Sequence, residues 1–451
     1  MANNNQHFVA VIGGAVSGSI SAEILADHGI RVAVIEQNTR PYGKIEDGLP
    51  RWHVEQRKQE YGNIDARMKK PGVSFIPSCK LGRDVSFDDL CNNWGFSAVI
   101  LANGAWRDRD IGVPGSEQFV DKGLVYQNPF IYWYNHKNEK SYDGPRYETP
   151  DETVVLGGGL ASIDVVKVLQ LETYERALKA RGINTNMHEL EKRGVPFVCN
   201  ANGIKPEDLG VKGCILVYRR REQDMPLQQP PENATPEQIA RTEQTRQKLL
   251  RLAREKFLFR VQFKTLTQGL VVENGRLVGL KVCDTLVEGR KATPIAGTER
   301  ELRAPLVISS IGSVPEVIPG VKMKGEYYTF TNEDEARYSE SDRVFGVGNV
   351  VTGQGNIRVS LIHSKKVTNR LIENYMGVGD GDGSISGVYA PAEANAAARA
   401  QAVQEKLQTL PKLSPAEVAA LEKRIRAQQE KVGYTGDYDS WIAKVTPPDL
   451  E

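Results

Sequence analysis

Two glycine-rich turns constrain the fold of this chain more than any other feature. The first reads Val11-Ile12-Gly13-Gly14-Ala15-Val16-Ser17-Gly18, and the second reads Val155-Leu156-Gly157-Gly158-Gly159-Leu160-Ala161-Ser162. Each follows a short apolar run and opens a helical pattern. In that context the glycines allow a tight turn, close approach of backbone to a pyrophosphate, and close packing of helix on strand. The helix N-terminus adds free N–H groups and a positive dipole end. Two such turns predict two dinucleotides held face to face.

Both turns depart from the usual pattern at one position. Ala15 stands where the first turn should have its middle glycine, and Ser162 replaces the last glycine of the second. We expect Ser162 to be a minor change. Ala15 places a methyl group where the backbone should approach the pyrophosphate. Of the two departures, we expect Ala15 to affect binding of a pyrophosphate more.

Size and charge exclude several classes of protein. A chain of 451 residues predicts two or three domains, and its 40% hydrophobic and 25% charged residues are ordinary for a globular protein. The formal net charge of +1 gives no global field that would favour nucleic acid or a membrane. The chain has no apolar run long enough for a membrane span and no signal-peptide pattern over Met1–His7, so we expect a cytoplasmic protein.

The cysteines exclude two kinds of redox site. None of the five lies in a Cys-x-x-Cys pair, and they are scattered through the chain: Cys79, Cys91, Cys199, Cys214 and Cys283. A redox disulfide between adjacent cysteines is therefore not expected. The same scatter predicts no iron–sulfur cluster, no structural zinc and no other metal site.

The first glycine turn belongs to a unit of strand 8–12, helix 19–28 and strand 31–35, with Gly29 ending the helix. Glu36 closes the second strand at the spacing where a dinucleotide fold places the acid that accepts from the ribose. We therefore predict that Glu36 and the first turn bind the adenosine half of one dinucleotide.

The second unit has a strand at 153–156, a helix from Leu160 to about Lys179, an insertion at 181–212 and a strand at 214–218. Where an NAD site would place an acid after this last strand, the chain has Arg219-Arg220-Arg221 followed by Glu222. Guanidinium groups pair bidentately with phosphate. The run therefore favours NADPH over NADH, with Arg219 and Arg220 the better candidates.

Further along the chain, Thr235 and Ser414 are predicted to cap helices that end near Lys256 and Lys431. A strand at 344–347 and Gly348-Asn349 return the chain to its first domain, and helices follow beyond Gly377.

Together these features make the chain similar to the two-dinucleotide-binding-domain flavoproteins. It most resembles the adrenodoxin-reductase-like ferredoxin–NADP reductases, and also the NADPH-linked flavin subunit of glutamate synthase. The resemblance covers about residues 7–377 and rests on Gly13, Gly18, Glu36, Pro41-Tyr42-Gly43, Pro50, Ala102-Asn103-Gly104-Ala105, Gly157, Gly159, Asp164, Tyr218-Arg219-Arg220-Arg221 and the Gly348–Gly355 segment. Asn349 departs from the Asp or Trp common in the family, and the cysteine-rich region of the glutamate synthase subunit is missing.

The resemblance implies an α/β fold of two Rossmann-like domains, with the NADP domain inserted in the FAD domain. The implied boundaries are 1–148 for the first part of the FAD domain, 149–333 for the NADP domain, 334–377 for the second part of the FAD domain, and 378–451 for a C-terminal helical extension.

It also implies which residues meet each cofactor. The FAD set is Gly13, Gly14, Ala15, Val16, Ser17, Gly18, Glu36, Gln37, Gly43, Lys44, Leu49, Ala102, Asn103, Gly104, Gly348, Asn349, Gly355, Asn356 and Ile357. The NADP set is Gly157, Gly158, Gly159, Leu160, Ala161, Ser162, Arg219, Arg220 and Glu222. Since a hydride passes between cofactors, no catalytic acid, base or nucleophile is expected.

The resemblance implies an NADPH-dependent oxidoreductase with a ferredoxin-like protein as electron acceptor. Two alternatives stay open: a flavin subunit of a larger complex, docked through the C-terminal helices, and a flavin reductase that acts on a small molecule. A nucleotide-binding regulatory protein is a third and weaker one. The same helices are a candidate contact for a homo-oligomer.

Overall fold

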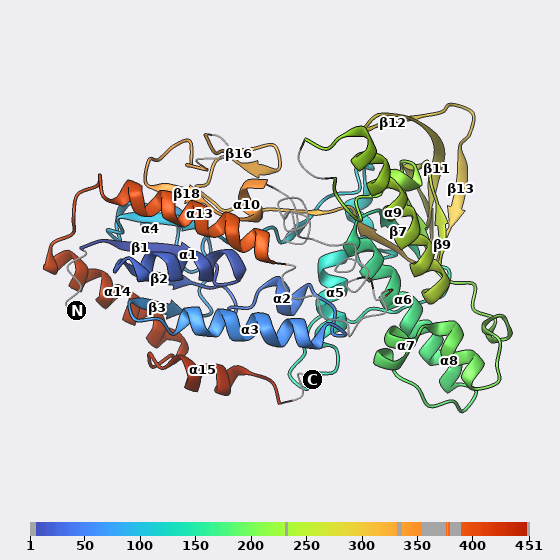
Figure 1. Cartoon of the computed structure of the whole chain (residues 1–451), viewed down its shortest axis with the longest axis horizontal. Helices are drawn as coiled ribbons and strands as arrows, with labels where there is room; N and C mark the ends of the chain where they lie inside the picture. Colours follow the sequence, from blue (N-terminus) through green and yellow to red (C-terminus); the bar gives the residue numbers. More distant parts are fainter. Residues whose placement is uncertain are drawn as a thin grey trace.

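Two lobes lie side by side, each built on a five-stranded parallel sheet (Figure 1). The computed structural model describes residues 6–230, 233–331, 336–352, 376, 378 and 389–448. The predicted α/β class with two parallel dinucleotide-fold sheets is confirmed. Within the described residues, no helix has both the length and the apolar character needed to cross a membrane.

The sheet of the first lobe has the strand order β18-β4-β1-β2-β3. Its strands are β1 (Phe8–Ile12), β2 (Arg31–Ile35), β3 (Val73–Ile76), β4 (Ala98–Leu101) and β18 (Val344–Gly346). β1 and β4 are buried at every residue, as expected for parallel strands covered on both faces. In register, Ile12 pairs with both Ile35 and Leu101, so the carboxyl ends of these strands meet at one edge.

Helices from both ends of the chain cover the first lobe. The N-terminal ones are α1 (Val16–Asp27), α2 (Lys44–Asp47), α3 (Val54–Met68) and α4 (Phe87–Asn92), and the short α10 (Asn349–Thr352) follows β18. The C-terminal ones are α13 (Ala390–Leu407), α14 (Pro415–Val432) and α15 (Tyr438–Val445). α13 packs along α1 and α14 against β3, so the C-terminal extension is part of this lobe (Figure 1).

The sheet of the second lobe has the order β6-β14-β7-β8-β9. Its strands are β6 (Leu124–Tyr126), β7 (Val154–Gly157), β8 (Ile215–Val217), β9 (Arg260–Gln262) and β14 (Val307–Ser310). The helices around it are α5 (Gln127–His136), α6 (Leu160–Lys179), α7 (Met187–Arg193), α8 (Val195–Ala201) and α9 (Pro236–Phe257). An antiparallel sheet extends from it, with β10 (Thr265–Glu273), β11 (Arg276–Glu288), β12 (Lys291–Pro294) and β13 (Arg300–Arg303).

Two short antiparallel strands carry the chain between the lobes. β5 (Arg107–Asp108) follows the first sheet and β15 (Ser313–Val314) leaves the second, and they pair with each other. The remaining short elements are the hairpin β16 (Met323–Lys324) with β17 (Tyr327–Tyr328) and the 3-10 turns η1 (Ser116–Phe119), η2 (Pro206–Leu209) and η3 (Glu222–Asp224). β6 joins the second sheet upstream of the predicted boundary at 148. The boundary at 333 lies outside the described residues, and all the predicted boundaries stay predictions.

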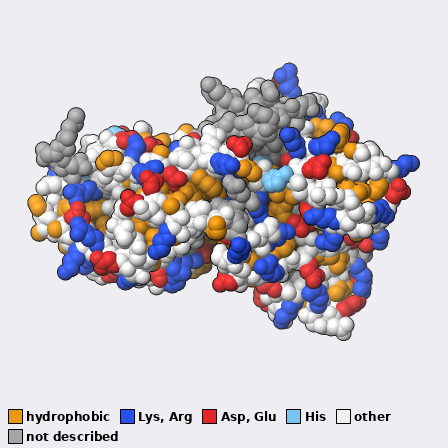
Figure 2. All heavy atoms as spheres, turned by 90° about the horizontal axis from the view of Figure 1, so that it is seen from below, with side chains coloured by type: hydrophobic (Ala, Val, Ile, Leu, Met, Phe, Trp, Pro, Cys, Tyr) orange, Lys and Arg blue, Asp and Glu red, His pale blue; other side chains and the backbone are white. Residues whose placement is uncertain are grey.

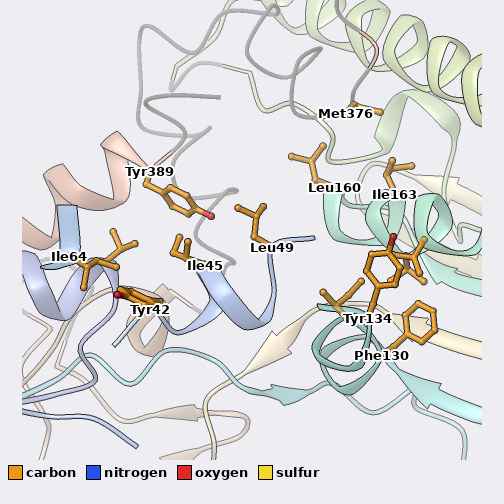
Figure 3. Close-up of a cluster of buried hydrophobic side chains, with 14 of the residues drawn as sticks. Tyr42, Ile45, Leu49, Ile64, Phe130, Tyr134, Leu160, Ile163, Met376 and Tyr389 are labelled. Carbon is orange, nitrogen blue, oxygen red and sulfur yellow. The ribbon is translucent and has the colours of Figure 1, made fainter. Parts of the chain in front are cut away.

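One hydrophobic cluster runs through both lobes. Figure 3 shows Ile45 and Leu49 beside Tyr389 of the first lobe, and Phe130 and Tyr134 gathered against α6 of the second. α2 contacts α5, and Asn135 of α5 donates to the backbone oxygens of Glu46 and Leu49 at 2.8 and 3.0 Å. The loop and short helix after β2 therefore join the lobes.

Two local predictions are confirmed. Thr235 and Ser414 both form capping boxes, with Gln238 and Glu417 as their partners.

One predicted helix starts earlier than expected. The helix predicted from Ser19 begins at Val16, because Ala15 already occupies the N-cap and the glycine turn supplies the first helical turn. The aromatic-rich segment from Leu124 to His136 forms β6 and α5.

Candidate functional site

The first glycine turn is shaped by two glycines that no larger residue can replace. Gly13 has φ +97°, and a Cβ there would lie 2.7 Å from the carbonyl oxygen of Ala102. A Cβ on Gly18 would lie 1.8 Å from the carbonyl oxygen of Gly13. The turn therefore packs α1 directly on the strand ends, and the first N–H groups of the helix have no intrahelical acceptor.

Glu36 lies beneath this turn at the end of β2. Its carboxylate accepts from the backbone N–H of Gly14 at 2.7 Å and from that of Asn38 at 2.9 Å. The side chain is buried, and burial raises the pKa of Glu36 to about 7 although these N–H groups favour the charged form. The predicted ribose-binding acid is thus hydrogen-bonded to the glycine turn with which it was expected to bind the dinucleotide.

A cleft opens at these strand ends. Most of the predicted FAD residues line it: Gly13, Ala15, Val16, Ser17, Glu36, Gln37, Gly43, Lys44, Ala102, Asn103, Gly104 and Asn349. Other predicted residues do not line it: Gly14, Gly18, Leu49 and Gly348. Gly355, Asn356 and Ile357 lie outside the described residues. Segments that are distant in the chain therefore line one cleft.

The residues that stand behind the cleft wall support its shape. A Cβ on Gly348 would lie 2.5 Å from the Oγ of Ser17, so the glycine lets the strand end of β18 approach the first turn. Leu49 is buried next to α5, where its backbone oxygen accepts from Asn135 at 3.0 Å. These two residues position the cleft without lining it.

Sequence reasoning missed part of the lining. The additional residues come from the ends of β1 and β2, from the loop after β3 and from the segments around β5 and β15: Ile12, Ile35, Cys79, Lys80, Leu81, Ala105, Trp106, Glu316 and Ile318. The position of Cys79 to Leu81 just beyond a parallel strand was an available signal. No local pattern marks Glu316 and Ile318, because only tertiary packing brings them to the cleft.

Ala15 is accommodated by a glycine from another segment. A Cβ built on Gly43 would lie only 2.8 Å from the Cβ of Ala15. Gly43 itself has φ +51°, a backbone conformation that favours glycine. The extra methyl of the first turn therefore occupies the space that residue 43 leaves open.

The cleft fits a large polar ligand such as a dinucleotide. Asn103 donates through Nδ2 to the hydroxyl of Tyr328 at 3.0 Å. Its Oδ1 is buried and has no hydrogen-bond partner among the described residues. A buried acceptor without a partner is costly, and a ligand hydroxyl or N–H in the cleft would satisfy it. The glycine-lined helix N-terminus beside it suits a pyrophosphate.

The second turn has the same arrangement of a larger residue against a glycine. A Cβ on Gly157 would lie 2.7 Å from the Cβ of Ser162, and the Oγ of Ser162 donates to the backbone oxygen of Gly159 at 2.6 Å. A Cβ on Gly158 would lie 2.3 Å from the ring of Tyr218, whereas one on Gly159 would meet nothing within 4 Å. Leu160 and Ala161 follow in the first turn of α6.

The three arginines after β8 have different surroundings. Arg219 is exposed. Arg220 donates to the hydroxyl of Tyr218 at 3.0 Å and to the backbone oxygen of Asp224 at 3.1 Å. Arg221 forms an ion pair with the Asp224 carboxylate at 2.9 Å, and Glu222 opens the 3-10 turn between them. Arg219 and Arg220 thus remain the better phosphate candidates.

No protein-family model matches the chain. It is 30% identical to NADPH:adrenodoxin oxidoreductase of Arabidopsis thaliana over 171 residues, which is 38% of this chain and 34% of that protein. It is 23% identical to the glutamate synthase [NADPH] small chain of Escherichia coli over 389 residues, 81% of this chain and 68% of that one. The chain therefore spans about a third of the Arabidopsis relative.

The solved structure of FprA from Mycobacterium tuberculosis in complex with NADPH has a similar fold. The TM-score is 0.65 at 17% identity, over 94% of this chain and 91% of FprA. With the two sequence relatives, this confirms the resemblance predicted from the glycine turns and the residues around them.

Proposed function

We propose that the chain, which resembles the two-domain FAD- and NADP-dependent oxidoreductases, is an NADPH-dependent flavoenzyme that reduces a ferredoxin-like protein. The observation that carries this proposal is the pair of glycine turns on neighbouring sheets, with a buried acid behind the first and arginines behind the second. The first turn and its cleft hold FAD, and the second holds NADPH.

FAD, when bound, would supply the redox chemistry, namely acceptance of a hydride from NADPH and release of two electrons, one at a time, and a proton. The protein would bind and orient this cofactor. The N-terminus of α1 would hold its pyrophosphate, Glu36 would accept a hydrogen bond from its ribose, and the buried Oδ1 of Asn103 would accept another at the cleft wall.

The arginines after β8 support NADPH as the reductant. An exposed guanidinium at Arg219 and a second at Arg220, fixed by Tyr218 and Asp224, offer planar donors to the 2′-phosphate that NADH lacks. The segment has no acid at the position where an NAD site would bind the 2′-hydroxyl.

A ferredoxin-like acceptor is supported by the Arabidopsis relative, whose name is NADPH:adrenodoxin oxidoreductase, and by the scattered cysteines, which offer no adjacent pair for a disulfide relay. Acidic and basic side chains are interspersed on the face seen in Figure 2. No single-signed patch on that face therefore identifies the docking surface.

The second candidate is a flavin subunit of a larger complex. It is favoured by the match to the glutamate synthase small chain, which extends over 81% of this chain. The C-terminal helices pack on the first lobe, and their outer faces are the docking element under this alternative. The cytoplasmic location and the homo-oligomer stay predictions from the sequence.

The test is an anaerobic NADPH titration of the purified protein, followed by addition of oxidised ferredoxin. We expect a bound flavin that bleaches with one equivalent of NADPH and is reoxidised by two equivalents of ferredoxin. Bleaching without reoxidation would overturn the acceptor and leave the reductase. An absence of bound flavin after addition of FAD would overturn the whole proposal. Co-purification of a large partner subunit would favour the second candidate.

A further inference from the structure

Lys44 is a cleft-lining cation that binds the other lobe. It begins α2, directly after Gly43, and lines the cleft of the first lobe. Its Nζ donates to the Oδ1 of Asn128 at 3.0 Å and to the Oγ of Ser313 at 3.3 Å. Asn128 lies in the first turn of α5, which follows β6, and Ser313 begins β15, which follows β14. Both partners thus extend directly from strands of the second sheet.

These partners also bind one another and the linking strand. Asn128 donates through Nδ2 to the Oγ of Ser313 at 3.0 Å and to the backbone oxygen of Trp106 at 2.9 Å. Its backbone N–H donates to the carboxylate of Asp108 in β5 at 3.2 Å. The network therefore joins α2, α5 and both linking strands at the point where the lobes meet.

Two opposing effects act on the charge of Lys44. Burial lowers its pKa to about 8, and the nearby carboxylates of Asp108 and Asp47 favour the charged form. The ammonium also lies 5.6 Å from the centre of the Trp106 ring, another residue of the cleft wall. An ammonium has three donors, and Asn128 and Ser313 use two of them. Within the part of the chain that the structure describes, one donor is left for a ligand in the cleft.

The position of Lys44 assigns the two ends of the cleft. Glu36 lies at the end of β2 within the first lobe, and the first turn packs against Gly43. The Nζ of Lys44 extends from there to Asn128 and Ser313 of the second lobe. A nicotinamide held by the second lobe must reach the flavin ring, so the ring has to lie at the Lys44 end and the adenosine at the Glu36 end.

Resting on the proposed function, we propose that Lys44 is a positioning residue with two tasks in this reaction. It holds the second lobe in register with the cleft through Asn128 and Ser313. It also places a positive charge beside the flavin ring, where reduction leaves negative charge, so that the reduced cofactor binds more tightly than the oxidised one.

Lys44→Met tests the second task by the midpoint potential of the bound flavin, measured with dithionite and a reference dye in the absence of NADPH. We expect the preference for reduced over oxidised flavin to fall about tenfold, which lowers a two-electron potential by about 30 mV. Lys137→Met is the matched control. Lys137 caps α5 and pairs with Glu172 at 2.5 Å, but it does not line the cleft, and its removal should leave the potential unchanged.

Asn128→Ala tests the first task, because it removes the shorter of the two contacts between Lys44 and the second lobe and keeps both the ammonium and its contact with Ser313. We expect an unchanged potential and a rate of flavin reduction by NADPH at least tenfold lower. If Lys44→Met loses its flavin, Lys44→Gln, which is neutral and keeps a donor, carries the potential measurement.

An unchanged potential in the neutral Lys44 variant overturns the electrostatic task. An unchanged reduction rate in Asn128→Ala overturns the positioning task. If NADPH does not reduce the flavin of the wild-type protein, the proposed function fails, whatever the Lys44 variants show.

Discussion

The methyl group of Ala15 lies where a side chain of residue 43 would begin, since a Cβ on Gly43 would stand 2.8 Å from it. The second turn repeats this relationship, with Ser162 set against the missing side chain of Gly157. Each departure from the glycine pattern is therefore matched by a glycine in contact with it. Ala15 does not push the turn out of position, because the space it needs is available on the side of Gly43.

Gly43→Ala should weaken FAD binding by at least about tenfold. The new Cβ would collide with Ala15 and strain a residue at φ +51°, a conformation that costs about 1–3 kcal/mol for a residue with a side chain. The dissociation constant is measured by the recovery of FAD fluorescence on release.

The double variant Ala15→Gly/Gly43→Ala separates these two causes. We expect it to recover the part due to the collision and not the part due to φ, and Ala15→Gly alone should bind FAD about as the wild type does. If the double variant is no better than Gly43→Ala, the contact with Ala15 is not what matters.

Gly158→Ala and Gly159→Ala should have opposite phenotypes. A methyl on Gly158 enters the ring of Tyr218, whereas a methyl on Gly159 meets no protein atom within 4 Å. We expect Gly158→Ala to lose about 1–3 kcal/mol of unfolding free energy. Gly159→Ala should lose less than about 1 kcal/mol and yet bind NADPH at least tenfold more weakly, because its methyl faces the ligand.

Urea unfolding and NADPH titration of the two variants check this prediction. Normal NADPH affinity in a stable Gly159→Ala protein would show that the second turn does not approach a pyrophosphate.

Glu36 should make the unfolding free energy fall as the pH rises. Burial raises its pKa from the ordinary 4.5 to about 7 in the folded protein. Between these values the folded state holds a proton that the unfolded state has lost. The stabilisation is complete below pH 4.5 and disappears as the pH rises through 7. The shift corresponds to roughly 3 kcal/mol.

Urea unfolding at pH 5 and pH 7.5 without added FAD measures this effect. The fall should be smaller in Glu36→Gln by about 2 kcal/mol, most of that amount, and unchanged in Glu55→Gln, which alters an exposed residue of α3. Parallel pH profiles for the wild type and Glu36→Gln would contradict the prediction.

The sequence predicted the elements whose pattern is local. The strands at 8–12 and 31–35 and the helix from Leu160 to Lys179 have the predicted bounds, because apolar runs and glycine turns mark them directly. It did not predict β5 and β15, which are two residues long and exist only because the two crossings between the lobes pair with each other.

The same distinction applies to the candidate site. Glu36 was found from its spacing to Gly18, since that spacing is a property of one strand–helix–strand unit. Glu316 and Ile318 line the cleft but follow β15, and nothing in their own segment indicates it. The docking of the C-terminal helices was equally hidden, because an amphipathic helix shows which face is buried and not what buries it.

Trp441 should support FAD binding from the C-terminal end of the chain. Its Nε1 donates to the backbone oxygen of Thr39 at 2.8 Å, and Tyr438 shares Asp65 with Tyr42, at 2.7 and 3.0 Å. α15 thereby holds the segment that runs into Gly43. Trp441→Phe, which removes the hydrogen bond and part of the buried ring, should cost at least about 1 kcal/mol of unfolding free energy and weaken FAD binding several-fold.

Trp94→Phe is the matched control for this prediction. Trp94 is equally buried, at 6% exposure, and donates to the Asp89 carboxylate at 2.8 Å on a different part of the lobe. The two variants should lose similar stability, and only Trp441→Phe should lose FAD. Equal FAD affinity in both would mean that α15 stabilises the lobe without supporting the cleft.

Arg219→Ala/Arg220→Ala should abolish the preference of the enzyme for NADPH over NADH. Each guanidinium bonded to the 2′-phosphate contributes about 1.5–3 kcal/mol, so the KM for NADPH should rise at least tenfold relative to the KM for NADH, with kcat little changed. Arg221→Ala is the internal control, because Arg221 is already paired with Asp224 at 2.9 Å and its loss should change the KM ratio by less than threefold. Steady-state reduction of an artificial acceptor with each nucleotide gives the ratio. If the KM values for NADPH and NADH rise together in the double variant, the two arginines support the turn after β8 and do not bind the 2′-phosphate.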